Sequence, residues 1–215
     1  MADEGLPAGN RPAGNEQASS VARTVASTPP SEPVPRPGLS LWIATAGGVG
    51  FGPWAPGTWG ALLAVVLYLA VLDRLPFTLF VLIGVLVTAA GIWASDAVED
   101  WFGKPDDGRI VVDEVAGQWI ALFPVAFLNG LPLADLPILG LDAKWFLVVT
   151  AFVAFRWFDI RKPGPVKWAE KNFKGGLGVM ADDVVAGVLA AIVVMLPAFL
   201  LVTSSLESSL VGGAG

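Results

Sequence analysis

Long apolar runs alternate with short polar connections along most of this chain. Runs of roughly 20 mostly apolar residues are long enough to cross a bilayer as helices. The pattern predicts about five such runs, some of them candidates for re-entrant or interfacial segments: Thr58–Leu72, Pro76–Ala94, Val115–Leu133, Lys144–Phe158 and Val184–Thr203. Pro124 interrupts the third run, whereas Pro197 is expected to bend the last helix without ending it. The pattern therefore predicts an all-α, polytopic membrane protein.

The two ends of the chain differ from this apolar centre. Met1–Pro37 is rich in Pro, Ala, Gly, Ser and Glu and has no apolar period, so a disordered tail is expected. Asp3 and Glu4 stand where a signal peptide would need an apolar core, so none is expected. Gly38–Trp54 contains many glycines and is too short to span, which predicts an interfacial or re-entrant segment. The predicted membrane domain covers residues 38–205, followed by a flexible C-terminus at residues 206–215.

The composition supports the membrane class and limits the possible chemistry. Of the 215 residues, 54% are hydrophobic and 15% are charged, against roughly 25% charged residues in soluble domains. The chain contains no cysteine and no histidine. Disulfides, thiolate metal sites, phosphohistidine mechanisms and serine triads with an imidazole base are therefore excluded. Any acid–base or metal chemistry must come from carboxylates, with Lys or Arg as electrostatic partners.

Basic residues are unevenly distributed among the connections. The connection before the last span holds Arg156, Arg161, Lys162, Lys167, Lys171 and Lys174. The connection after the second span holds Lys104 and Arg109, whereas the opposite face would carry only Arg74 and Lys144. Because cytoplasmic connections are enriched in Lys and Arg, the basic connections are expected to face the cytoplasm. The polar segments Gly50–Gly60, Asp96–Gly117 and Arg156–Asp183 then fall on one face.

Carboxylates recur on that face, beside the ends of the apolar runs. Those nearest the ends are Asp113, Glu114, Asp159, Asp182 and Asp183. Such clusters bind hard divalent cations, and Mg²⁺ commonly combines one or two carboxylates with substrate phosphate oxygens. Arg156, Arg161 and Lys162 lie close to Asp159 in the sequence and suit phosphate oxygens. Together these groups favour metal-assisted phosphoryl transfer.

Structural interpretations compete with this functional one. Asp182 and Asp183 are candidates for capping the last helix, because Asp is a preferred N-cap. Arg156 and Asp159 stand three residues apart, the spacing of an ordinary helical ion pair. Asp96 and its acidic neighbours are expected to form a solvated face beyond a helix end. The remaining basic residues, Lys167, Lys171 and Lys174, are interpreted as a topology signal that contacts anionic lipids.

Four motifs follow one another along the chain. They are Pro56-Gly57-Thr58-Trp59-Gly60, Val112-Asp113-Glu114-Val115-Ala116-Gly117, Phe155-Arg156-Trp157-Phe158-Asp159-Ile160-Arg161-Lys162-Pro163, and Gly176-Leu177-Gly178-Val179-Met180-Ala181-Asp182-Asp183 with Ala186-Gly187. In this order and spacing they resemble the phosphatidylglycerophosphatase A family, from about Gly38 to Val202. The resemblance implies an integral membrane, Mg²⁺-dependent lipid phosphatase that converts phosphatidylglycerophosphate to phosphatidylglycerol in bacterial phospholipid synthesis. It also implies a bacterial cytoplasmic (inner) membrane location.

The resemblance further implies which residues form the site. The division of roles among them is our own assignment, in which Asp113, Glu114, Asp182 and Asp183 are expected to hold Mg²⁺. Asp159 is expected to orient water or to attack phosphorus, while Arg156 and Lys162 hold the phosphoryl oxygens. Substrate binding is assigned to Pro56, Gly57, Thr58 and Arg161. The choice between a water mechanism and a phospho-aspartate intermediate stays open.

Two other functions compete with this one. A membrane phosphotransferase that uses CDP-alcohols would also place aspartates and a metal at the membrane face. Its pattern needs Asp-Gly, then Ala-Arg, then two spaced aspartates, and Asp107-Gly108-Arg109 begins differently. A transporter or small membrane scaffold is the non-enzymatic alternative, for which broken helices and charges at mid-membrane would be typical. Here the charges gather at one face, which favours chemistry on a lipid headgroup.

Overall fold

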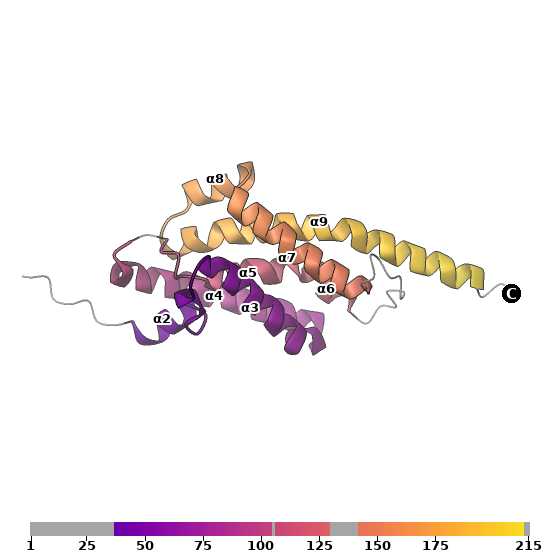
Figure 1. Ribbon diagram of the computed structural model, residues 1–215, viewed down its shortest axis with the longest axis horizontal. Helices are drawn as coiled ribbons and strands as arrows, with labels where there is room; N and C mark the ends of the chain where they lie inside the picture. Colours follow the sequence, from indigo (N-terminus) through magenta and orange to yellow (C-terminus); the bar gives the residue numbers. More distant parts are fainter. Residues whose placement is uncertain (1–36, 105, 130–141, 213–215) are drawn as a thin grey trace, which may run out of the picture. The chain divides into compact units, whose positions relative to one another are not determined.

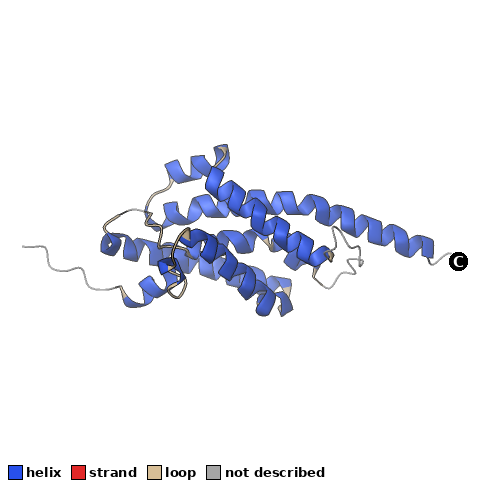
Figure 2. Ribbon diagram, in the orientation of Figure 1, coloured by secondary structure: helices blue, strands red, loops and turns tan. Residues whose placement is uncertain are grey.

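The computed structural model describes residues 37–104, 106–129 and 142–212, and its regular elements are all helices (Figure 1, Figure 2). In chain order they are α2 (Gly38–Ala44), the 3-10 turn η1 (Val49–Phe51), α3 (Pro56–Ala70), the 3-10 turn η2 (Leu72–Arg74), α4 (Phe77–Phe102), α5 (Val112–Ala121), α6 (Phe123–Leu128), α7 (Ala143–Arg161), α8 (Gly164–Asn172) and α9 (Gly175–Gly212). The predicted all-α fold is confirmed for these residues.

Three helical segments are long and apolar enough to cross a membrane: Pro56–Arg74, Phe77–Phe102 and Gly175–Glu207. They contain three of the five predicted spans. Large apolar side chains on them, such as Leu82 in α4 and Leu196 in α9, are more than half exposed. Such a surface is typical of helices that face lipid.

The other two predicted spans are not confirmed as membrane-crossing helices. The run Lys144–Phe158 does lie within one helix, the 19-residue α7. The charged side chains of Lys144, Arg156 and Asp159 interrupt its apolar character. The count of five spans therefore stays a prediction, and three is the number of apolar spanning helices found in the described residues.

The run Val115–Leu133 differs most from the prediction, because it is divided between two short helices. α5 ends at Ala121 and α6 begins at Phe123, with Pro124 in its first turn. Proline has no N–H and its ring clashes with the carbonyl four residues earlier, so the helix cannot continue unchanged through Pro124. Residues 130–133 of the predicted span lie outside the described residues.

Helix α5 lies inside the protein rather than against lipid. Its buried residues are Val112, Asp113, Val115, Ala116, Gly117, Gln118, Trp119 and Ala121, which leaves only Glu114 and Ile120 partly accessible. The helices packed around it are α3, α4, α7 and α9. Gly117 permits the close crossing with α9, since a Cβ atom there would lie 2.7 Å from the backbone oxygen of Asp183. A helix enclosed in this way can carry polar side chains into the membrane domain without exposing them to lipid.

The ends of the membrane domain agree only partly with the sequence analysis. Gly38–Trp54 forms the seven-residue α2 and η1, too short to span as expected, and its interfacial position stays a prediction. Trp42 and Trp54 are exposed in this segment. Apart from Pro37, the predicted tail lies outside the described residues. α9 continues to Gly212, so the predicted boundary at residue 205 does not coincide with a helix end.

Candidate active site

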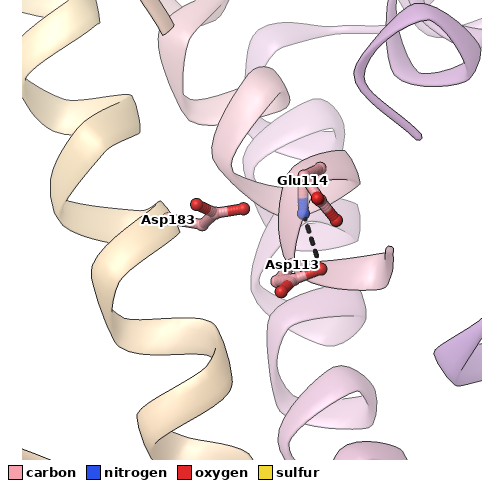
Figure 3. Close-up of side chains that lie close together, drawn as sticks. All are labelled: Asp113, Glu114 and Asp183. Carbon is pink, nitrogen blue, oxygen red and sulfur yellow. Dashed lines mark hydrogen bonds between the residues drawn. The ribbon is translucent and has the colours of Figure 1, made fainter. Parts of the chain in front are cut away.

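The first turn of α5 carries two carboxylates that meet a third from α9. The amide of Glu114 donates to Oδ1 of Asp113 at 3.0 Å. Asp183 points from α9 toward both of them (Figure 3). One ligand atom from each of Asp113, Glu114 and Asp183 lies within 4.8 Å of the others. Asp113 and Asp183 are buried, and Glu114 is partly buried.

The start of α9 excludes the capping interpretation of Asp182 and Asp183. The helix begins at Gly175, so both aspartates stand two turns inside it. Oδ1 of Asp96, in α4, instead accepts a hydrogen bond of 2.5 Å from the amide of Gly176. Asp96 is exposed, in agreement with the expected solvated face, and its carboxylate also binds the first turn of α9. Sequence reasoning missed this role because the two residues stand 80 positions apart.

Arg156 and Asp159 of α7 form the ion pair that their spacing predicts. Nη1 of Arg156 lies 2.6 Å from Oδ2 of Asp159, and both side chains are mostly buried. Neither Nε nor Nη1 of Arg156 has an aligned hydrogen-bond acceptor among the described residues. The pair is therefore held mainly by charge, and the guanidinium keeps donors free. Nη1 also lies near Gly57, where a Cβ atom would be 3.3 Å away.

Lys162 ends α7 and binds two carboxylates. Its Nζ donates to Oδ2 of Asp182 at 2.7 Å and to Oε1 of Glu170 at 2.9 Å. Burial alone would lower the pKa of Lys162, but the hydrogen bonds to Asp182 and Glu170 outweigh it and raise this pKa above its ordinary value. Asp182, expected as a metal ligand, is thus engaged with Lys162 and lies outside the three-carboxylate group. Asp182 and Glu170 also line a cavity of about 310 Å³.

The segment expected to bind substrate begins α3. Pro56 occupies the first turn of that helix, Gly57 is buried and Thr58 is partly exposed. Gly57 lies directly against the carboxylate of Glu114. Arg161 is exposed at the end of α7. The structure therefore places Gly57 beside the carboxylate group. Among the described residues, Arg161 forms no ion pair or hydrogen bond with that group.

Repulsion and burial both disfavour the charged forms of these carboxylates. Burial, followed by the negative charge of Glu114, raises the pKa of Asp113 well above its ordinary value. Burial is also the main cause that raises the pKa of Glu114 to about 8, against the lowering effect of its hydrogen bond with Asp113. A cation placed among them would favour the charged forms, because it would offset the clustered negative charge.

The donor set fits a hard divalent cation. It consists of carboxylate oxygens without histidine or cysteine, the ligand type that suits Mg²⁺. Oε2 of Glu114 and Oδ2 of Asp183 are buried and have no hydrogen-bond partner among the described residues. Such unpaired buried acceptors are uncommon unless a ligand, water or ion satisfies them.

One buried polar residue in this region was not expected from the sequence. Gln118 of α5 is fully buried, and neither of its side-chain polar atoms has a hydrogen-bond partner in the described part of the chain. The one available signal was its position four residues after Glu114, because residues at that spacing lie on the same face of a helix. Within an apolar run, a single Gln carries no recognisable motif.

Comparisons with known proteins agree with the resemblance seen in the motifs. The family model described as phosphatidylglycerophosphatase A matches residues 42–198. A Bacteroides thetaiotaomicron protein, provisionally named a phosphatidylinositol-3-phosphatase, is 44% identical over 73% of this chain and 91% of its own length. Proteins named phosphatidylglycerophosphatase A from Escherichia coli K12 and Haemophilus influenzae are 36% and 35% identical. Those matches cover 69% and 68% of this chain and 77% and 83% of the respective relatives. No solved structure matches significantly.

Proposed function

Because this chain belongs to the phosphatidylglycerophosphatase A family and is an enzyme, we propose that it hydrolyses phosphatidylglycerophosphate to phosphatidylglycerol and phosphate. The observation that carries the proposal is the group of three carboxylates beside Arg156. That group combines ligands for a divalent cation with a cationic side chain suited to phosphate oxygens. The apolar helices α3, α4 and α9 support a membrane-bound enzyme acting on a lipid.

We assign Asp113, Glu114 and Asp183 as the residues that would hold Mg²⁺. When bound, Mg²⁺ supplies positive charge that stabilises the negative charge developing on a phosphoryl group during transfer. The carboxylates set the position of that charge, because two of them belong to one turn of α5 and the third to the neighbouring α9. Asp182 stays a proposed Mg²⁺ ligand only in a state in which its hydrogen bond with Lys162 is broken.

Arg156 and Lys162 are assigned to the phosphate oxygens. Asp159 orients the Arg156 guanidinium through their ion pair, and the free donors of Arg156 are available to a substrate. Lys162 uses two of its three donors on Asp182 and Glu170, which leaves one for a phosphate oxygen.

The orientation of the site is also part of this proposal. The basic residues around it, with Lys162 among them, favour a site that faces the cytoplasm. The cytoplasmic membrane of a bacterium is the location that follows, since the matched relatives are bacterial. A role in phospholipid synthesis depends on the same substrate assignment.

A second candidate substrate comes from the Bacteroides relative. Its name points to phosphatidylinositol 3-phosphate, and it is 44% identical to this chain. Both substrates present a phosphate monoester on a lipid headgroup, so the carboxylates and Arg156 suit either. Phosphate release by the purified protein from both lipids, in matched mixed micelles, tests the assignment. Faster release from phosphatidylglycerophosphate is expected, and a preference for phosphatidylinositol 3-phosphate would overturn it.

A further inference from the structure

The unpaired polar atoms of the domain concentrate around α5. Of the buried side-chain atoms without a hydrogen-bond partner in the described ranges, six belong to four residues: Glu114, Gln118, Arg156 and Asp183. Three of these residues already have a place in the proposed chemistry. Gln118 does not, although an unpaired amide in a protein interior lowers the free energy of unfolding and calls for a functional reason.

Gln118 lies one helical turn behind Glu114, on the same face of α5. Side chains of an α-helix lean toward its N-terminus, and long ones lie over the residues three and four positions earlier. A Gln118 side chain that follows this tendency extends toward Glu114, at the end of α5 that carries the site.

The turn of α5 that carries Gln118 is closed to solvent. Gly117, the preceding residue, contacts Phe155 of α7 closely enough that a Cβ atom would lie 2.5 Å from that ring. Trp119, the following residue, donates through Nε1 to the backbone oxygen of Ala64 in α3 at 3.0 Å. Since the exposed fraction of Gln118 is 0%, bulk water cannot satisfy its amide directly.

The unpaired atoms of Gln118, Arg156 and Glu114 are complementary in type. Nε of Arg156 is a donor without an acceptor, and Oε2 of Glu114 is an acceptor without a donor. A glutamine amide offers one acceptor, Oε1, and two donor hydrogens on Nε2. Arg156 and Glu114 also lie together, since both border Gly57.

We propose that Gln118 is a positioning residue whose amide bridges Arg156 and Glu114 when cation and substrate are bound. Oε1 accepts from Nε of Arg156, and Nε2 donates to Oε2 of Glu114. The bridge holds the guanidinium so that its terminal nitrogens face the phosphate, and it fixes the orientation of one metal-binding carboxylate. This role deepens the proposed function and rests on it.

Gln118→Met tests the bridge, because methionine is similar in volume and removes both polar atoms. Loss of a residue that orients a metal ligand typically costs about 10–100-fold in metal affinity or activity. We expect a fall of that size in kcat, or an equal rise in the Mg²⁺ concentration needed for half-maximal rate. The Tm of the metal-free protein should stay level or rise, because two unpaired buried groups are removed.

Ser95→Ala is the matched control. Ser95 is buried in α4, and its Oγ also lacks a partner among the described residues. This variant should keep the wild-type rate and Mg²⁺ dependence. Wild-type kcat and an unchanged Mg²⁺ midpoint in Gln118→Met would overturn the proposal, as would a fall in metal-free Tm that accounts for the lost activity.

The Mg²⁺-induced rise in Tm separates this proposal from the substrate assignment. It needs no lipid substrate, and it should be smaller in Gln118→Met than in the wild-type protein. A wild-type protein that is stabilised by Mg²⁺ but releases no phosphate from phosphatidylglycerophosphate would refute the proposed function alone. An equal Mg²⁺-induced rise in both proteins, with equal rates, would refute the bridge alone.

Discussion

Gly57 at the start of α3 packs directly against the carboxylate of Glu114 in α5, so that a Cβ atom on residue 57 would overlap Oε1 of Glu114. The space that a side chain would take is filled instead by Glu114, with Nη1 of Arg156 beside it. The first turn of α3 therefore forms one wall of the site. Through this contact, Gly57 sets the position of the Glu114 carboxylate without supplying a polar side-chain atom of its own.

Gly57→Ala should reduce activity while leaving the fold intact. Alanine is favoured over glycine within a helix by about 1 kcal/mol, and the overlapping atom is the end of a flexible side chain that can move aside. The displaced carboxylate would no longer hold the cation in place, so we expect kcat/KM to fall by at least about tenfold. Rates of phosphate release and Tm in detergent measure both effects.

Gly108→Ala is the control for this substitution, since a Cβ atom there meets nothing within 4 Å. It should leave both the rate and Tm unchanged. Wild-type activity in Gly57→Ala would show that the wall contact has no part in the reaction.

Gly187→Ala, unlike Gly57→Ala, should lower the stability of the protein. A Cβ atom at residue 187 would overlap the backbone oxygen of Gly117, and backbone cannot move aside as a side chain can. Forcing extra volume into a packed contact typically costs about 1–3 kcal/mol. Thermal unfolding in detergent should show a lower Tm than the wild-type protein. An unchanged Tm would contradict the close crossing of α5 and α9.

Asp113→Asn and Asp183→Asn should each abolish stabilisation by Mg²⁺. A ligand that binds only the folded state raises Tm by an amount that grows with its concentration relative to its Kd, and each substitution raises that Kd by removing one charged ligand. We also expect phosphate release to fall by at least about 100-fold, the scale of losing a principal electrostatic contribution to the transition state. Tm measured with Mg²⁺ and with chelator gives the first result independently of substrate.

Asp107→Asn is the matched control for these two aspartates. Asp107 pairs with Arg109, with a distance of 2.6 Å between Oδ1 and Nε, and is not one of the three grouped carboxylates. The variant should keep both the Mg²⁺ response and the rate. A Mg²⁺ response that survives in Asp113→Asn and Asp183→Asn would disprove the assigned ligands.

Single cysteines can test the orientation of the site, because the natural chain contains none. Cysteines replacing Lys104 and Arg161 should react with a membrane-impermeant thiol reagent only in inside-out vesicles. A cysteine at Asp142, at the other end of α7, should react only in right-side-out vesicles. Lys104 and Arg161 labelled from opposite sides would contradict a single cytoplasmic face.

The grouping of the charged residues was easier to predict from the sequence than the helices around them. Asp113, Glu114 and Asp183 stand in short motifs of charged residues at the ends of apolar runs, where charge is costly and therefore informative. Their meeting brings together two of the three polar segments expected on one face, and the contact of Gly57 with Glu114 adds the third. The Arg156–Asp159 pair was likewise foreseeable, because a helix fixes neighbours three residues apart.

Other features depend on tertiary packing that one chain's pattern does not encode. Hydropathy detects an apolar run, but it does not distinguish lipid from protein as the surroundings, so α5 resembled part of a span although it is enclosed. The roles of Asp96 and Gly57 come from contacts with residues far away in the sequence. Asp182 resembled a metal ligand because Asp183 follows it in the sequence. Consecutive residues of a helix point to different sides, however, and the carboxylate of Asp182 binds Lys162 instead.

The most direct test of the central claim is phosphate release from phosphatidylglycerophosphate by the purified protein, measured with Mg²⁺, with a chelator, and after Mg²⁺ is restored. If the three carboxylates of α5 and α9 hold Mg²⁺, phosphate should be released with Mg²⁺, not with chelator, and again when Mg²⁺ is restored. Release that continues at the same rate in chelator would contradict a metal-dependent site, and no release in any condition would contradict the activity itself.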